Sequence, residues 1–148
     1  MPGTLAHPVR EARLSDAPGI AELLTELGYP VSPERLGRRL QLLSGEHATR
    51  VVVAEAGQEL CGVAALHVMH LLERDDPVCR LTALVVAPEA RGKGVGRALM
   101  TRVDREARSR ACVRIEVTTA GHQAGDREFY ERLGFEKRPT HLAFELRD

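Results

Sequence analysis

The chain has 148 residues, the length of one domain, with 21 basic and 21 acidic residues and only 3% aromatic residues. This balance excludes a strong overall field toward nucleic acid or membranes, so we expect neither as a partner. We therefore treat residues 1–148 as a single domain.

The first third of the chain predicts one strand and two helices. Residues 8–14 fit a strand. Ser15 or Asp16 is a suitable N-cap for a helix that ends at Gly28, because apolar residues recur between them at helical spacing. A second helix is predicted from Ser32 and Pro33 up to a glycine at position 45.

The middle of the chain changes to a strand pattern. Apolar, β-branched runs occupy residues 50–56, 60–72 and 79–87, and the turn sequence AGQE between the first two predicts a hairpin. The third run has apolar residues on both faces, which is typical of a strand inside a sheet. A helix pattern starts at Gly94.

The last third predicts a strand at 112–119, a short helix at 125–134, and two short strands at 135–138 and 142–147. The resulting order, β-α-α-β-β-β-α-β-α-β-β, predicts a mixed α/β fold. It does not fit the regular alternation of a doubly wound sheet.

The segment ARGKGVGRALM, residues 90–100, joins a predicted strand to a predicted helix. Backbone amides at a helix N-terminus are unpaired and carry partial positive charge, and glycines let an anion approach the main chain closely. The segment adds three glycines and three basic side chains, namely Gly92, Gly94, Gly96, Arg91, Lys93 and Arg97. We interpret it as a site for a diphosphate.

Two common phosphate loops do not fit this spacing. A P-loop requires Ser or Thr directly after GK, and here Gly94 follows Lys93. A dinucleotide-binding fingerprint requires its third glycine one residue later than Gly96, and an acidic residue about 20 positions further on.

Two stretches together resemble the GNAT superfamily of N-acetyltransferases. VVAPEARGKGVGRALM matches the acetyl-CoA motif, with Arg91, Gly94 and Gly96 in its fixed positions. About 30 residues later, FYERLGF matches the second signature through Phe129 and Tyr130, followed by Leu-Gly-Phe. The order of elements also fits along essentially the whole chain.

The resemblance implies a central, twisted, mostly antiparallel sheet of six to seven strands flanked by about four helices. It implies that the donor is acetyl-CoA and that its diphosphate lies against the residues of the loop, Arg91, Gly92, Lys93, Gly94, Val95, Gly96 and Arg97. The end of the preceding strand, Leu84, Val85 and Val86, would separate from its neighbour and pair with the pantetheine arm. The amide of Val86 is the expected donor to the thioester carbonyl.

The same resemblance assigns Tyr130 as the acid that protonates the departing thiolate. The general base stays open, because the strand 79–87 has no carboxylate. The candidates are water and five side chains, namely His67, His70, Glu73, Asp75 and Asp76. His67 and His70 are three residues apart, so on a strand they would face opposite sides.

We therefore predict an N-acetyltransferase that moves the acetyl group of acetyl-CoA directly to a primary amine of a small molecule or peptide in a ternary complex. The alternative is a non-catalytic module that binds or senses acyl-CoA. Cys61, Cys79 and Cys112 form no metal-binding pattern, so we expect no metal. The first residues lack a signal-peptide pattern, which favours a cytoplasmic protein, and the resemblance is compatible with a homodimer. The acceptor stays open.

Overall fold

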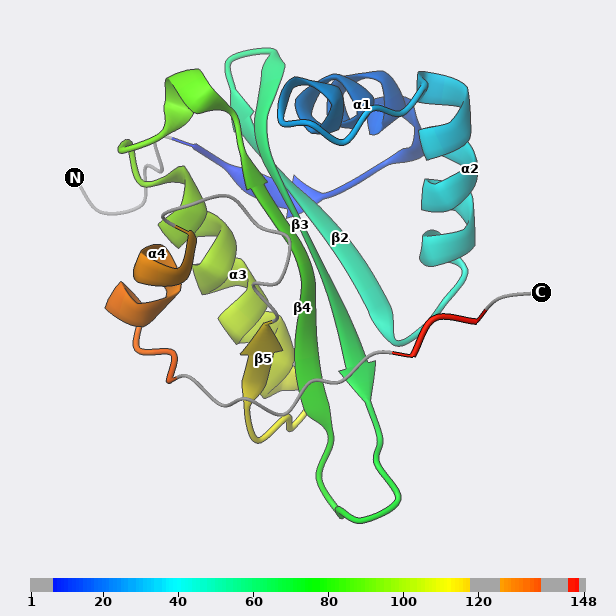
Figure 1. Ribbon diagram of the computed structural model, residues 1–148, viewed down its shortest axis with the longest axis vertical. Helices are drawn as coiled ribbons and strands as arrows, with labels where there is room; N and C mark the ends of the chain where they lie inside the picture. Colours follow the sequence, from blue (N-terminus) through cyan, green and yellow to red (C-terminus); the bar gives the residue numbers. More distant parts are fainter. Residues whose placement is uncertain (1–6, 118–125, 137–143, 147–148) are drawn as a thin grey trace. The chain divides into compact units, whose positions relative to one another are not determined.

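The computed structural model describes residues 7–117, 126–136 and 144–146 (Figure 1). Their helices and strands follow the predicted order up to the last helix, so the mixed α/β fold is confirmed. The elements are β1 (Val9–Glu11), the short 3-10 helix η1 (Leu14–Asp16), α1 (Ala17–Glu26), α2 (Pro33–Ser44), β2 (Thr49–Ala56), β3 (Glu59–Met69), β4 (Val78–Val86), the 3-10 helix η2 (Pro88–Ala90), α3 (Val95–Ser109), β5 (Ile115–Val117) and α4 (Asp126–Arg132).

The described residues form a five-stranded sheet in the order β1-β2-β3-β4-β5, against an expected six to seven strands. The two additional strands, predicted at 135–138 and 142–147, lie largely outside the described residues. The first strand is shorter than predicted, because residues 14–16 turn into η1. Every other predicted strand and α-helix is present in the described residues, but β3 ends at Met69, before the predicted residue 72, and β5 begins at Ile115, after the predicted residue 112.

β1 to β4 pair antiparallel, whereas β5 runs parallel to β4. The amide of Val113 donates to the carbonyl of Pro77 and that of Cys79 donates to Arg114, both at 3.0 Å. Since both residue numbers rise together along the two strands, the strands share a direction. A parallel pair needs a crossover connection, and α3 provides it.

Contacts group the fold into two compact units, Met1–Glu116 and Val117–Asp148. The first unit holds helices α1 to α3 and nearly all of the sheet, and the second holds α4. A single domain over residues 1–148 stays a prediction.

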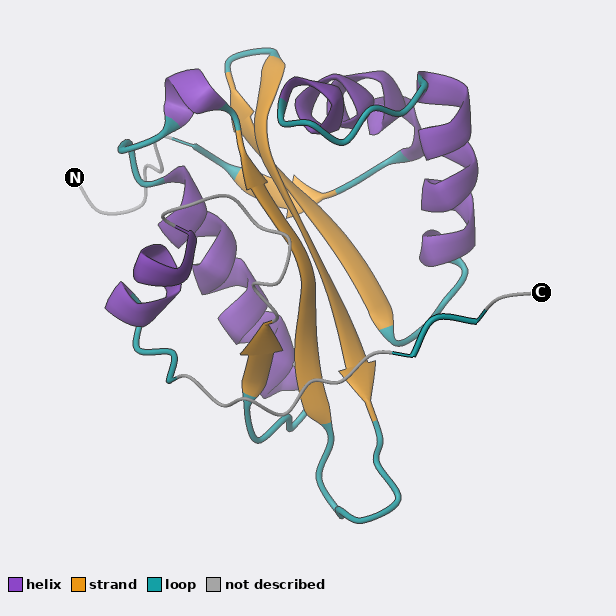
Figure 2. Ribbon diagram, viewed as in Figure 1, coloured by secondary structure: helices purple, strands orange, loops and turns teal. Residues whose placement is uncertain are grey.

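In the first unit, α1 and α2 cover one face of the sheet and α3 covers the other (Figure 2). Gly62 of β3 marks the α3 face, because a Cβ built on it would lie 2.9 Å from Val95 Cγ1 and 3.0 Å from Leu99 Cδ1. By strand alternation, Ala64, Leu66 and Val68 share that face, and all are buried. The absence of a side chain at position 62 therefore lets the first turn of α3 lie directly on β3.

We expect Gly62→Ala to lower the free energy of unfolding by roughly 1–3 kcal/mol, the usual cost of overpacking a close contact. The new methyl group would also meet the carbonyl oxygen of Val85 at 3.2 Å, so the strand cannot simply shift away from α3. Urea denaturation measures the change.

The matched control is Gly37→Ala on α2, where the new Cβ would lie 3.8 Å from Ala17 Cβ, an ordinary contact. Alanine is the better helix former, so this variant should be as stable as the parent or more stable by up to about 1 kcal/mol. If Gly62→Ala were as stable as Gly37→Ala, the inference that α3 packs closely on β3 at Gly62 would be wrong.

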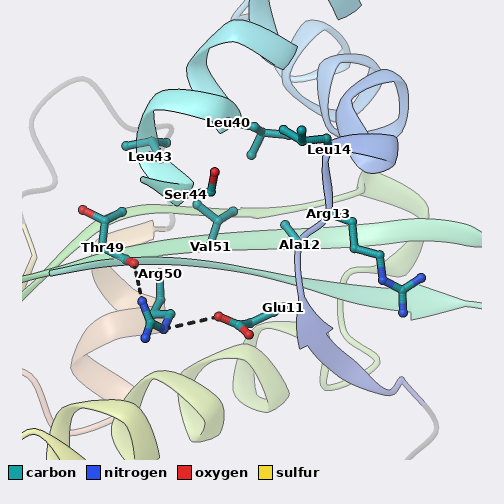
Figure 3. A pocket seen from close by; sticks show the side chains of 10 residues that line it. All are labelled: Glu11, Ala12, Arg13, Leu14, Leu40, Leu43, Ser44, Thr49, Arg50 and Val51. Atoms are coloured by element: carbon teal, nitrogen blue, oxygen red, sulfur yellow. Dashed lines mark hydrogen bonds and ion pairs between the residues drawn. The ribbon is translucent and has the colours of Figure 1, made fainter. Parts of the chain in front are cut away.

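A small pocket of about 110 Å³ lies between α2, β2 and the segment after β1 (Figure 3). Two of its polar side chains pair with each other, since Arg50 Nε lies 3.3 Å from Glu11 Oε1. Its lining residues are Glu11, Ala12, Arg13, Leu14, Leu40, Leu43, Ser44, Thr49, Arg50 and Val51. None of the site residues predicted from the sequence lines it.

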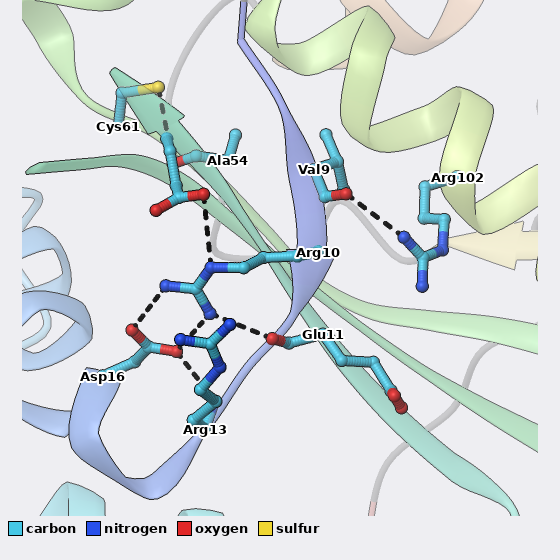
Figure 4. Close-up of polar contacts among 9 residues, drawn as sticks. Val9, Arg10, Glu11, Arg13, Asp16, Ala54, Cys61 and Arg102 are labelled. Carbon is cyan, nitrogen blue, oxygen red and sulfur yellow. Dashed lines mark hydrogen bonds and ion pairs between the residues drawn. The ribbon is translucent and has the colours of Figure 1, made fainter. Parts of the chain in front are cut away.

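Arg10 fixes the entry into α1 (Figure 4). Its Nη1 and Nη2 donate to the two carboxylate oxygens of Asp16 at 2.8 and 2.9 Å, and its Nε lies 3.3 Å from Glu55 Oε1. Hydrogen bonding to Arg10 lowers the pKa of Asp16 against the opposing effect of burial. Asp16 precedes α1 as predicted, but its carboxylate accepts from the amide of Arg13 at 2.7 Å and does not cap α1.

The predicted cap of the second helix is confirmed, since Ser32 Oγ accepts from the amide of Arg35 at 3.2 Å.

Candidate active site

The junction between β4 and α3 is built by a short series of turns. After Val86 the chain is held to β3 by the amide of Ala87, which donates to the carbonyl of Cys61 at 2.8 Å. The 3-10 helix η2 follows, and residues 91–94 then form an exposed turn that leads into α3. The junction is thus anchored at both ends and open to solvent in the middle.

Two glycines of this turn adopt a left-handed backbone, with φ of 76° at Gly92 and 85° at Gly94. A Cβ at either position would meet nothing within 4 Å, so the conformation and not crowding requires glycine there. Gly96 lies within the first turn of α3 and has no positive φ, so it does not use this freedom.

The N-terminus of α3 carries unpaired donors and uncompensated charge. The first backbone bond of the helix runs from the amide of Ala98 to the carbonyl of Gly94, at 3.0 Å, which leaves the amides of residues 95–97 without a partner inside the helix. Gly94 occupies the N-cap position and has no side chain that could accept from these amides. The exposed basic side chains of the turn form no ion pair with any described residue; they are Arg91, Lys93 and Arg97. Both features favour an anion.

The end of β4 presents backbone groups on the side away from β3. Because the amide of Ala87 points to β3, alternation along an antiparallel pair directs Val85 toward β3 as well. The amides and carbonyls of Leu84 and Val86 then point outward. Glu116 of β5 lies beside Arg80, where the two side chains form an ion pair, so Leu84 and Val86 lie further along β4.

The five candidate bases lie toward the opposite end of β4 from the loop. Gly62 pairs with Val86, whereas His67 pairs with Arg80, five residues along β3, or roughly 16 Å at the usual strand rise. His70, Glu73, Asp75 and Asp76 come after the end of β3, at the hairpin end farthest from Val86. None of the five is therefore in direct reach of the Val86 amide.

His67 belongs to a hydrogen-bonded chain. Its Nδ1 lies 2.9 Å from Thr49 Oγ1, and that hydroxyl donates to Glu46 Oε2 at 3.0 Å. With the hydroxyl donating to Glu46, a hydrogen bond to His67 requires the tautomer that carries a proton on Nδ1. This chain holds the imidazole in one orientation.

The sequence interpretation missed a charged cluster formed by Arg80 of β4, Arg114, and Glu116 of β5. Arg80 Nη2 lies 3.0 Å from Glu116 Oε1, and Arg114 contacts Glu116 Oε2 through Nη2 at 2.6 Å and Nε at 2.7 Å. Burial alone would raise the pKa of Glu116, but the hydrogen bonds and charges of both arginines outweigh it and lower the pKa. Arg114 and Glu116 stand two residues apart in the strand predicted at 112–119, which is the only signal the sequence offers.

Tyr130 lies on α4 in the second compact unit. Its side chain is buried, and its ring makes edge contacts with Phe129 and Phe135 at centroid distances of 5.3 and 5.5 Å. α4 ends before Gly134, whose φ of 100° stops the helix as predicted. The second signature is thus a helix with a small aromatic cluster of its own.

Three further observations on the described part of the chain concern metal ligands, thiols and membrane spans. No group of three His, Cys, Asp or Glu side chains could hold a metal ion among these residues. Cys61 and Cys79 are buried, and burial raises the pKa of the Cys79 thiol to about 12, which disfavours a nucleophilic thiolate. No helix of the described ranges is long and apolar enough to span a bilayer.

Comparison with known families decides the assignment. The profile of the Acetyltransferase (GNAT) family matches residues 17–135, most of the chain. The chain belongs to the GNAT acetyltransferase family. The turn at residues 91–94 and the aromatic helix α4 both fall inside the matched region, so the GNAT chain carries both signatures in the expected elements.

Solved structures agree with the fold of this GNAT acetyltransferase. A putative acetyltransferase from Agrobacterium tumefaciens is 23% identical with a TM-score of 0.81, covering 95% of this chain and 99% of the other. A Trypanosoma brucei acetyltransferase is 24% identical with a TM-score of 0.79, covering 95% and 99%. The glucosamine-6-phosphate N-acetyltransferase of Arabidopsis thaliana is 19% identical with a TM-score of 0.80, covering 97% and 100%. No curated protein sequence matches the chain.

Proposed function

We propose that this acetyltransferase uses acetyl-CoA as donor and transfers the acetyl group directly to a primary amine. The observation that carries the proposal is the turn before α3. Two left-handed glycines there expose the unpaired amides of the first helical turn beside three basic side chains that have no ion-pair partner among the described residues. Such an arrangement suits a diphosphate better than a single carboxylate, because it offers several donors and more than one positive charge.

The loop would hold the diphosphate through the backbone of residues 91–96, and Arg97 would add charge. The pantetheine arm would then lie along β4, pairing with the outward groups of Leu84 and Val86 as an added strand would. This requires only main-chain donors and acceptors. Val85 would contribute through its side chain, since its own amide is directed to β3.

Acetyl-CoA supplies the acetyl group as a thioester, which is already activated toward amines. The amine nitrogen attacks the carbonyl carbon, a C–N bond forms and the C–S bond breaks. One outward amide of β4, expected to be that of Val86, would donate to the carbonyl oxygen as negative charge develops. Tyr130 would donate its hydroxyl proton to the departing sulfur.

An alkyl ammonium has a pKa of about 10, so the acceptor must lose a proton before it attacks. Water is the simplest carrier of that proton, because the five candidate bases are remote from Val86 along the strand register. Glu116 is poorly suited to the task, since its two arginine partners lower its pKa. The proton given up by Tyr130 is replaced from solvent. Overall, an amine and a thioester react to give an amide and a thiol.

The acceptor is proposed to be a small molecule or a peptide. Among structures of the same fold, one is described as a glucosamine-6-phosphate N-acetyltransferase and another as an aminoglycoside acetyltransferase in complex with sisomicin. These names support a small amine without selecting one. The cytoplasmic location and the homodimer stay predictions from the sequence.

The test is release of free coenzyme A thiol from acetyl-CoA against a panel of polyamines, aminoglycosides, amino sugars, amino acids and peptide N-termini. We expect at least one amine to raise thiol release well above the rate in its absence, with an acetylated product of the matching mass. Thermal stabilisation by acetyl-CoA with no turnover on any amine would instead favour a non-catalytic acyl-CoA-binding module.

A further inference from the structure

The cluster around Glu116 lies on the face of the sheet away from α3. His67 and Arg80 are cross-strand partners, and His67 alternates with Leu66 and Val68, which face α3. A polar row therefore crosses the sheet from Thr49 on β2 through His67 and Arg80 to Glu116. At this end of the face Ala65, His67 and Met69 are half-buried, whereas Val78, the cross-strand partner of Met69, is fully buried.

The two arginines of the row outnumber the carboxylate that pairs with them, and Glu46 places a second carboxylate beside Thr49 at the other end of the row. Two arginines share the single carboxylate of Glu116, and no other described acid forms an ion pair with either of them. Arg80 uses only Nη2 in that pair, so its Nε and Nη1 have no partner among the described residues. Its side chain is 40% exposed and that of Arg114 is 36% exposed, so the charge is accessible from solvent.

The position of the row fits the acceptor better than the donor. The donor diphosphate is proposed to lie at residues 91–97, beyond the C-terminal end of β4. An arm that runs from there along Val86 and Leu84 points its acyl end back toward the middle of β4 and so toward Arg80. An amine that meets the acyl end can extend the rest of its molecule along this face.

We propose that Arg80, with Arg114 beside it, binds an anionic group of the acceptor, so that the substrates of this enzyme are primary amines that carry a carboxylate or a phosphate. This inference rests on the proposed acetyl transfer. A guanidinium whose Nε and Nη1 have no partner among the described residues recognises planar carboxylate and tetrahedral phosphate equally well, so the proposal names the shared oxyanion chemistry. Glu73, Asp75 and Asp76 of the loop after β3 form no ion pair with either arginine.

The experiment compares three series of primary amines with increasing spacer length: ω-amino carboxylates, their uncharged carboxamides, and aminoalkyl phosphates. Because Arg80 is several residues along the strand from Leu84, we expect the charged series to show an optimal spacer length. At that length the parent enzyme should favour the charged acceptor over its carboxamide by roughly tenfold or more in kcat/KM, the usual worth of a charged hydrogen bond. The carboxylate and phosphate arms show which oxyanion the site prefers.

Variants separate recognition from structure. Arg80→Gln should remove the preference by raising KM for charged acceptors about tenfold while leaving the carboxamides unaffected, and Arg80→Lys should retain part of it. Arg108→Gln is the matched control, because Arg108 is an exposed arginine on α3 paired with Asp104. Retained activity on carboxamides shows that the Arg80→Gln protein is folded.

Equal kcat/KM for charged and uncharged amines, or an equal loss on both in Arg80→Gln, would overturn the proposal and leave the cluster a structural ion pair. If no amine is acetylated at all, the proposed function fails but the site can still be tested. Inorganic phosphate and acetate would be titrated by calorimetry into protein saturated with coenzyme A, which fills the loop. Binding that disappears in Arg80→Gln supports the site, and no binding by the parent protein overturns it.

Discussion

Replacing Tyr130 by phenylalanine will slow acetyl transfer at least about tenfold and leave the affinity for coenzyme A nearly unchanged. The variant removes one hydroxyl, and with it the proposed proton donor to the departing sulfur, an effect that typically amounts to a factor of about 100 or more in acid catalysis. The ring stays, so its edge contacts with Phe129 and Phe135 are preserved. The loss should therefore appear in kcat and not in binding.

Steady-state kinetics and calorimetry with coenzyme A measure the two effects separately. Tyr29→Phe is the matched control, because Tyr29 is the other tyrosine of the chain and is 47% exposed. The kcat of Tyr29→Phe should equal that of the parent enzyme within experimental error. Turnover of Tyr130→Phe equal to that of the parent would remove this hydroxyl from the mechanism, and a large loss of coenzyme affinity would point to a binding role instead.

Gly94→Ala should weaken coenzyme A binding by about tenfold or more, equivalent to roughly 1.4 kcal/mol. Gly94 has a φ of 85° directly before α3, and a side chain in this region costs roughly 1–2 kcal/mol. The turn can relieve that strain by leaving the left-handed conformation. The amides of the first helical turn and Lys93 would then no longer converge on one anion.

Gly28→Ala provides a control with the same backbone strain at another site. Gly28 follows α1 with a φ of 93°, and a Cβ there would also meet nothing within 4 Å. Urea denaturation should show a similar decrease in the free energy of unfolding for both variants, but only Gly94→Ala should bind coenzyme A more weakly. If the two bound coenzyme A equally well, the shape of the turn would not matter for the donor.

Local features of the fold could be predicted from the sequence because neighbouring residues cause them. The hairpin at AGQE, the Ser32 cap and the stop at Gly28 each depend on a few consecutive residues. Asp16 was misread for the same reason. Asp16 directly precedes α1, but its carboxylate accepts two hydrogen bonds from Arg10 on β1 and one from the amide of Arg13, so it does not cap α1.

The donor loop and the Arg80–Glu116 pair of the candidate site also differ in how far the sequence predicts them. The donor loop is one continuous segment, so its residue types and spacing suffice to propose its ligand. The Arg80–Glu116 pair joins residues 36 positions apart and exists only because β5 runs beside β4. Nothing in either segment alone indicates that partner. The remoteness of the five candidate bases likewise became visible only through the strand register.

The close contact at Gly62 has a consequence for the kinetics of coenzyme recognition. Since the first turn of α3 rests on β3, its amide donors hold their positions before any ligand arrives, and binding need not order them. If the loop binds coenzyme A as proposed, we expect the encounter to be limited by diffusion in the field of the three basic side chains instead of by a slow conformational step. Added salt would slow the arrival of the coenzyme, while the pre-set geometry of the helix would be left intact.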